Sequence, residues 1–202
     1  IHNSAYGSGS SHTIVNATLV ANHAERGGGL YSERELATHA LALSNAILWG
    51  NTATDGGAQA FNGGAEVTIS HSIVEGSGGS AAWDAGLGAD GSSNLDQPPG
   101  FLREPDPGDG DWATLADNDY GDLRLGAASP AVDAGDNAAL PADAYDLDAD
   151  GDTTEALPLD RDSSPRLVGA RGGPAIVDMG AYETAGGIGR ARLSTSRPLS
   201  RS

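Results

Sequence analysis

The chain has 202 residues, with 28 acidic side chains against 11 basic ones and a formal net charge of −17. A surface this acidic repels phosphate groups, so we expect no nucleic-acid partner and no anionic lipid partner. The absence of cysteine excludes a disulfide framework and thiol chemistry. No apolar run approaches the roughly 20 residues of a membrane span, so we expect no direct membrane insertion.

The first part of the chain is a repeat. Residues 16–32 align without a gap on residues 45–61 at a constant offset of 29, and seven of the 17 aligned positions are identical. A weaker third copy follows, in which Ile69 and Ile73 fall 26 residues after Leu43 and Ile47. Repeats of this length are typical of units that stack because none buries its apolar face alone. The segments are short, rich in β-branched residues and bounded by glycine pairs, which predicts strands and turns.

One polar column runs through the repeat. Asn16, Asn45 and His71 occupy equivalent positions, between apolar residues that are five positions apart. On a flat strand an odd separation would point those apolar side chains to opposite faces, so the chain must bend if both face one core. Asparagine suits such a bend because it tolerates unusual backbone angles and bonds backbone groups locally. We therefore predict a structural ladder of Asn16, Asn45 and His71.

Two parts of the sequence resemble a known group of proteins. The pattern N-x5-N-x4-GG, followed by residues 67–77, looks like the coils of right-handed parallel β-helix proteins of the pectate-lyase-like architecture. Further along, the segments that resemble the C-terminal portion of bacterial secreted β-helix proteins of the choice-of-anchor Q type are residues 122–141, 146–152, 165–169 and 177–183. The resemblance implies an all-β fold, a right-handed parallel β-helix or solenoid with a loop-rich C-terminal capping region. It also implies a secreted or cell-surface location, and no particular activity.

Three regions follow from composition. Residues 1–95 are expected to form the β-helix coils, and residues 96–183 a loop-rich acidic cap that covers the end of the column. Residues 184–202 lack acidic side chains and carry four of the 11 basic ones, so we expect a disordered Arg/Ser-rich tail. Because the first residues read as a coil already in progress, we expect the sequence to be truncated at its N-terminus.

The strongest chemical motif is an acidic run. Carboxylates at alternate positions, with Gly151 after the third, place several hard oxygens around one turn, as a calcium loop requires. The predicted metal ligands are Asp146, Asp148, Asp150 and Asp152. At the twelfth position of the loop pattern Leu157 replaces the usual bidentate glutamate, so Asp160 or Asp162 would have to supply that ligand. The alternative is a solvated acidic turn.

Two further hypotheses concern glycans. Trp49 aligns with Val20 and Glu75 in the other copies, so its column tolerates polar residues and Trp49 could face outward to stack on a sugar ring. Ordinary packing is the competing interpretation. Asp55, Glu75 and Asp84 are the acids that a glycan-cleaving enzyme could use, but no complete catalytic motif accompanies them.

The sequence therefore favours a non-catalytic secreted or cell-surface β-helix module with a structural, adhesive or glycan-binding role. A structural calcium ion is the one cofactor we expect, and polysaccharide or cell-surface glycans are the partners. The alternative is a fragment of a polysaccharide lyase or glycoside hydrolase whose catalytic coils lie upstream.

Overall fold

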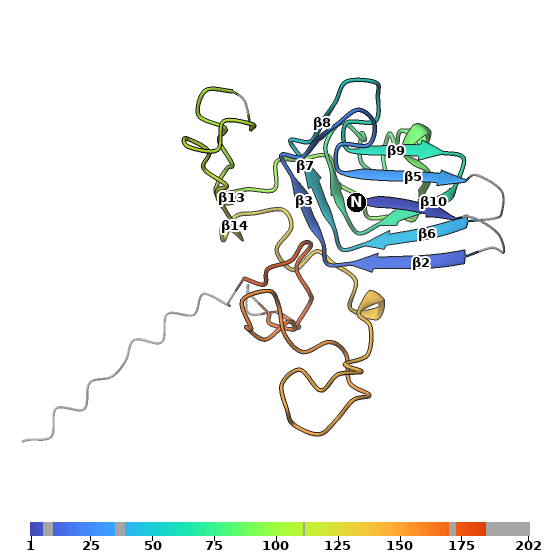
Figure 1. Cartoon of the computed structure of the whole chain (residues 1–202). Coiled ribbons are helices and arrows are strands. Elements are labelled where there is room, and N and C mark those ends of the chain that lie inside the picture. Colours follow the sequence, from blue (N-terminus) through green and yellow to red (C-terminus); the bar gives the residue numbers. More distant parts are fainter. Residues whose placement is uncertain (6–9, 35–38, 111, 170–172, 185–202) are drawn as a thin grey trace, which may run out of the picture.

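The computed structural model describes residues 1–5, 10–34, 39–110, 112–169 and 173–184 (Figure 1). In this part of the chain the regular structure is almost entirely β, with two single-turn 3-10 helices, η1 (Ala85–Leu87) and η2 (Asn137–Ala139). The tail predicted for residues 184–202 lies, apart from Thr184, outside the described residues. None of the helices in the described residues has the length and apolar character needed to span a membrane.

Three consecutive repeats supply equivalent strands. Repeat 1 contains β1 (His2–Ala5), β2 (Ser10–Val15), β3 (Thr18–Val20) and β4 (His23–Ala24). Repeat 2 contains β5 (Leu30–Arg34), β6 (His39–Ser44), β7 (Ile47–Trp49) and β8 (Thr52–Ala53). Repeat 3 contains β9 (Ala60–Gly63), β10 (Glu66–Ser70) and β11 (Ile73–Val74), and β12 (Ala89–Asp90) follows it.

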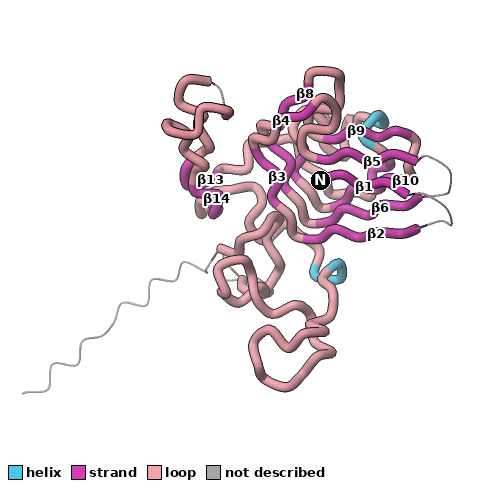
Figure 2. The backbone as a smooth tube through the Cα atoms, viewed as in Figure 1, coloured by secondary structure: helices cyan, strands magenta, loops and turns pink. Residues whose placement is uncertain are grey.

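Equivalent strands pair in parallel, so that four parallel sheets lie side by side within residues 1–95, here called the strand column. The strand orders are β1-β5-β9, β12-β10-β6-β2, β11-β7-β3 and β4-β8. Ile14 pairs with Leu43, and Leu43 pairs with Ile69, which reproduces the offsets of 29 and 26. The predicted all-β fold with parallel strands is confirmed, and Figure 2 shows these strands as the main regular part of the chain.

The interior of the strand column is an apolar cluster built by alternation. In β6, residues 39, 41 and 43 are buried while residues 40, 42 and 44 are more exposed, as expected for a strand with one inward face. Leu43 and Ile69 are fully buried, and Leu48 lies beside Leu19 in the paired strands β7 and β3. The chain therefore bends between Leu43 in β6 and Leu48 in β7, because both side chains belong to the same cluster.

A second apolar cluster lies on the outer side of β7 and β11. Ile47 and Ile73 are fully buried there against Phe101, Val132 and Met179 from the later part of the chain. The sequence predicts that residues 96–183 cover the end of the column; the contacts of the described residues show the loop-rich region, residues 96–184, packed against its side. The physical reason is that Ile47 and Ile73 point away from the interior, so this sheet has two apolar faces to bury.

The loop-rich region has little regular structure. Its strands β13 (Phe101–Arg103) and β14 (Asp122–Leu125) form an antiparallel pair. Beyond β14 the chain continues as loops, with isolated bridges between Ala142 and Ala156 and between Leu159 and Pro165. In Figure 1 these loops, coloured yellow to red, lie to one side of the parallel strands.

Candidate functional sites

The predicted ladder positions share one backbone conformation. The φ angles of Asn16, Asn45 and His71 are 51°, 53° and 45°, in the left-handed region that asparagine tolerates better than most residues. Asn45 Nδ2 donates to Asn16 Oδ1 at 3.3 Å, so the first two positions form an amide pair. The His71 side chain takes no part in that pair, and its Nδ1 is buried without a hydrogen-bond partner among the described residues.

The amide pair also fastens the loop-rich region to the strand column. Asn45 donates from Nδ2 to the Asp136 carbonyl oxygen at 3.0 Å and accepts from the Asp136 N–H at 2.7 Å. Asn16 Nδ2 donates to the Asp178 carbonyl oxygen at 3.0 Å. Sequence reasoning predicted these asparagines as bend formers but missed this second role, because the partners lie 91 and 162 residues further along the chain.

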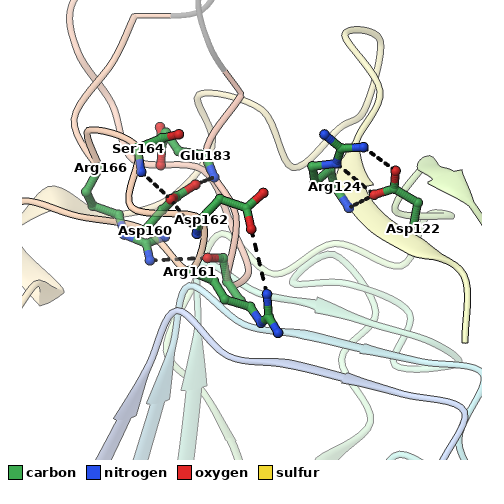
Figure 3. Close-up of polar contacts among 9 residues, drawn as sticks. Asp122, Arg124, Asp160, Arg161, Asp162, Ser164, Arg166 and Glu183 are labelled. Carbon is green, nitrogen blue, oxygen red and sulfur yellow. Dashed lines mark hydrogen bonds and ion pairs between the residues drawn. The ribbon is translucent and has the colours of Figure 1, made fainter.

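The docked segment contains a buried polar cluster. Asp178 has no exposed surface, and its two carboxylate oxygens accept from the backbone N–H groups of Asp133 and Thr184, each at 2.7 Å. The Asp178 N–H is in turn shared by the two Glu183 carboxyl oxygens at 3.2 Å. Asp160 Oδ2 accepts from the Glu183 N–H at 2.8 Å, and Figure 3 shows this contact.

Arg166 is the cation of this cluster. It is 4% exposed and donates to the carbonyl oxygens of Gly180 and Ala181, both at 3.3 Å. Burial lowers its pKa, against the opposing effect of Glu183, Asp160 and Asp178. Burial, followed by the charge of Asp178, raises the pKa of Glu183 to about 9, and burial also raises the pKa of Asp178. The cluster has a structural role in the loop-rich region, since its hydrogen bonds go to the protein's own backbone.

The acidic loop brings together a different set of carboxylates from the predicted one. Oxygens of Asp146, Asp148 and Asp150 lie within 4.8 Å of one another, as do oxygens of Asp143, Asp148 and Glu155. The backbone explains the second group: the Asp143 N–H donates to the Glu155 carbonyl oxygen at 2.9 Å, which joins the two ends of the loop. The pKa of Glu155 is raised by loss of solvation and then by the neighbouring aspartates, Asp150, Asp148, Asp152 and Asp143.

Three of the carboxylates proposed from the sequence belong to neither group. Asp152 Oδ1 instead accepts from the N–H and hydroxyl of Thr154, at 2.8 and 2.7 Å. Asp160 accepts from the N–H groups of Ser164 and Glu183, and Asp162 lies beside Arg161 (Figure 3). The sequence predicts Asp152 as a metal ligand because the alternation of carboxylates continues through it. In the structure the Thr154 hydroxyl supplies a local hydrogen-bond partner for this carboxylate instead.

Trp49 does not present a free ring. Its side chain is partly buried against the cluster that contains Ile47 and Phe101, which favours packing over the predicted glycan contact. Trp83 packs on the interior cluster and donates from Nε1 to the Gly88 carbonyl oxygen at 2.9 Å. Neither tryptophan lines the polar pocket described next.

A polar pocket is lined by residues of repeat 3, by the turn that precedes it and by the loop that follows it. Its volume is about 650 Å³, and its lining includes Gln59, Phe61, Asn62, Glu75 and Asp84. Glu75 Oε2 accepts from Gln59 Nε2 and from the Gly50 N–H, both at 2.7 Å, so this carboxylate is fixed in place. The pocket thus offers amides, carboxylates and one aromatic ring.

The Phe61 ring is held by a second aromatic ring. It stacks on Tyr31 with ring centroids 5.2 Å apart and an interplanar angle of 9°. Asp84 is exposed, and its Oδ1 accepts from the Gly86 N–H at 2.8 Å. Asp55, the third acid considered for catalysis, is not part of this pocket and pairs with Arg26 on the surface.

Comparison with known proteins adds no relative. No family model matches the chain, and no match was found among curated proteins or solved structures.

Proposed function

We propose that this chain is part of a secreted or cell-surface right-handed parallel β-helix protein of the choice-of-anchor Q type, and that it binds neutral polysaccharide without cleaving it. The β-helix assignment is supported by parallel strands that pair in register at offsets of 29 and 26 residues. Such a column presents its turns and side loops as an extended surface, on which repeat proteins place their ligands.

The observation that carries the binding proposal is the pocket lined by Gln59, Phe61, Asn62, Glu75 and Asp84. Its volume of about 650 Å³ falls inside the range of roughly 300 to 1,000 Å³ that is usual for small-ligand sites. Amide and carboxylate groups can donate to or accept from sugar hydroxyls, and the Phe61 ring offers an apolar face for a pyranose. This combination of groups suits one or two sugar residues of a longer chain.

Charge selects among glycans. The net charge of −17 and the two carboxylates of the pocket disfavour uronic acids and sulfated sugars. Neutral sugars carry no such penalty. The fixed position of Glu75 favours binding over catalysis, because its Oε2 is already engaged by two N–H donors.

Titration of the 202-residue chain against neutral and anionic oligosaccharides tests the proposal. Asp84→Asn should weaken binding of a neutral oligosaccharide by about tenfold, since a hydrogen bond to a charged group contributes about 1.5 to 3 kcal/mol. Glu66→Gln is the matched control, because Glu66 is an exposed carboxylate on β10 that does not line the pocket.

Equal binding by the two variants, or no binding of any neutral glycan, would overturn the proposal. A reducing-end assay on the same oligosaccharides separates binding from cleavage. Release of new reducing ends that is lost in Asp84→Asn would assign the pocket to a glycoside hydrolase instead.

A further inference from the structure

The acidic loop contains a buried carboxylate, Asp143, of which only one oxygen has a hydrogen-bond partner among the described residues. Asp143 is 1% exposed, and its Oδ2 accepts from the Leu147 N–H at 2.6 Å. Its Oδ1 is buried and has no hydrogen-bond partner among the described residues. Burying a carboxylate oxygen without a partner costs free energy, because its hydrogen bonds to water are lost and no others replace them.

A second orphaned oxygen lies in the same group. Glu155 Oε1 is also buried without a hydrogen-bond partner in the described part of the chain. Oxygens of Asp143, Asp148 and Glu155 lie within 4.8 Å of one another. Two oxygens on opposite sides of one Ca²⁺ are separated by about 4.8 Å, which is twice a typical Ca–O distance of about 2.4 Å. The three carboxylates can therefore reach a single ion.

The position of the group within the loop gives the ion a structural role. Asp143 and Glu155 stand at the two ends of the loop, where Ala142 and Ala156 form an isolated antiparallel bridge and the Leu157 N–H donates to the Pro141 carbonyl oxygen at 2.8 Å. Figure 1 shows this loop, in orange, projecting from the rest of the chain. A cation at its neck would join the two ends through side chains as well as through backbone.

Charge in the segment points the same way. Residues 143–162 contain eight carboxylates and one basic side chain, Arg161. Arg161 lies beside Asp162 and outside the group of three. No basic side chain of the segment therefore neutralises Asp143, Asp148 and Glu155, whereas a divalent cation would.

We propose that Asp143, Asp148 and Glu155 bind one structural Ca²⁺, with Asp146 and Asp150, whose oxygens also lie close to Asp148, contributing negative charge. Three carboxylates make an incomplete shell for an ion that takes six to eight oxygens, so waters and backbone carbonyls complete it. The ligand set differs from the alternating run that the sequence suggests, because the ends of the loop supply two of the three carboxylates. Small size and strict octahedral geometry make Mg²⁺ a poorer fit to an irregular site.

Calorimetric titration of the whole chain with CaCl₂ after treatment with chelator is the first test. The expected dissociation constant lies in the class of about 10⁻⁴ to 10⁻³ M that is usual for extracellular modules. Calcium at 1 mM should then raise the folding equilibrium constant about two- to elevenfold, and the melting temperature with it. Magnesium should have a smaller effect.

Variants of equal charge locate the site. Glu155→Gln and Asp148→Asn should each weaken calcium binding by at least about tenfold, which is no less than the loss of an outer-shell partner causes. Asp152→Asn is the matched control, since it removes one negative charge from the same loop but lies outside both carboxylate groups. In chelator, Glu155→Gln should melt at or above the temperature of the wild-type chain, which distinguishes a lost ligand from a damaged fold.

Two results would overturn the proposal. One is the absence of any calcium titration signal or melting shift up to several millimolar. The other is an equal loss of affinity in Asp152→Asn and Glu155→Gln, which would mean that calcium responds only to the overall charge of the loop.

Discussion

The strand column and the loop-rich region satisfy their backbone polar groups in different ways. In the strand column one repeat bonds the next, even in the turns, where the Gly27 N–H donates to the Gly56 carbonyl oxygen and the Gly28 N–H to that of Gly57, both at 3.3 Å. In the loop-rich region carboxylates do this work, as when Asp160 accepts from the Asp162 and Ser164 N–H groups at 2.8 Å.

The difference explains where the acidic residues are used. An aspartate that accepts backbone N–H groups two to four residues ahead replaces the partner that a neighbouring strand would supply. Many of the acids in the loop-rich region are therefore turn formers. We expect the stability of this region to respond to pH and cations, and that of the strand column to respond mainly to packing.

Asn45 should give the largest effect, because it belongs to both regions. Asn45→Ala removes the bond to Asn16 and both bonds to Asp136, takes the side-chain partner from the partly buried Asp136 N–H, and places alanine at a φ of 53°. We expect a loss of about 3 to 5 kcal/mol in the free energy of unfolding, measured by urea denaturation. Asn45→Gly, which relieves the backbone strain alone, should recover about 1 kcal/mol of that loss. Equal stability of Asn45→Ala and wild type would show that the two regions are not joined here.

A substitution confined to the strand column comes next. A Cβ on Gly28 would lie 2.4 Å from the Thr52 carbonyl oxygen and 2.7 Å from that of Ala58, both in the adjacent repeat. Gly28→Ala should destabilise the protein by about 1 to 3 kcal/mol, the usual range for overpacking. Gly173→Ala is the control, since nothing lies within 4 Å of its Cβ position. Equivalent urea midpoints for the two variants would contradict close contact between the turns.

Glu183 should make the loop-rich region sensitive to alkali. Its pKa is raised to about 9 in the folded protein, from an ordinary value of 4.5, so the folded state holds a proton that the unfolded state has lost between these values. Stability is therefore greatest below about pH 4.5 as far as this group is concerned, and decreases as pH rises toward 9. The slope should not exceed about 1.4 kcal/mol per pH unit. Asp178, whose pKa is also raised, adds a dependence of the same sign.

The measurement compares wild type with Glu183→Gln in urea from pH 5 to pH 9. The glutamine variant should lose much of the decrease, because it cannot ionise. Parallel curves for the two proteins would show that Glu183 ionises without cost to the fold.

The smallest effect is expected on the surface of the strand column. Arg26 and Asp55 form an ion pair between repeats 1 and 2, with side-chain exposures of 46% and 54%. Asp55→Asn should cost less than about 1 kcal/mol at low salt, and still less in 0.5 M NaCl, because exposed pairs are screened. A larger, salt-independent loss would mean that the pair supports the stacking of repeats.

The strand column could be predicted from the sequence because its pattern of apolar and turn residues is local and repeated. Each apolar column recurs at a fixed offset, and Asn16 and Asn45 mark the bend by residue type. The packing of the loop-rich region against the side of the column could not be predicted from the sequence. Ile47 points outward because Val132 and Met179 pack against it, and both lie far along the chain. No short-range pattern links residues that lie more than 80 positions apart.

The acidic loop was readable in part. Alternating carboxylates correctly suggest that Asp146, Asp148 and Asp150 lie close together. They give no sign of Asp143 and Glu155, which meet through a backbone bridge rather than through spacing. The buried polar cluster of Asp178, Glu183 and Arg166 was missed for the same reason, since its hydrogen bonds go to backbone groups far from any repeated spacing. Likewise Asn94 was missed, whose Nδ2 donates to the Ile69 carbonyl oxygen at 2.7 Å beyond the last full repeat.

The spacing between paired strands shortens along the chain, and this limits growth of the column. Ile14 and Leu43 are 29 residues apart, Leu43 and Ile69 are 26 apart, and Ile69 and Asp90 are 21 apart. The perimeter thus contracts from layer to layer, and the last layer contributes only the two residues of β12 and an isolated bridge from Leu95 to Ile73. A two-residue strand is a poor template for another chain, so this contraction protects that end from fibril-like addition of further molecules.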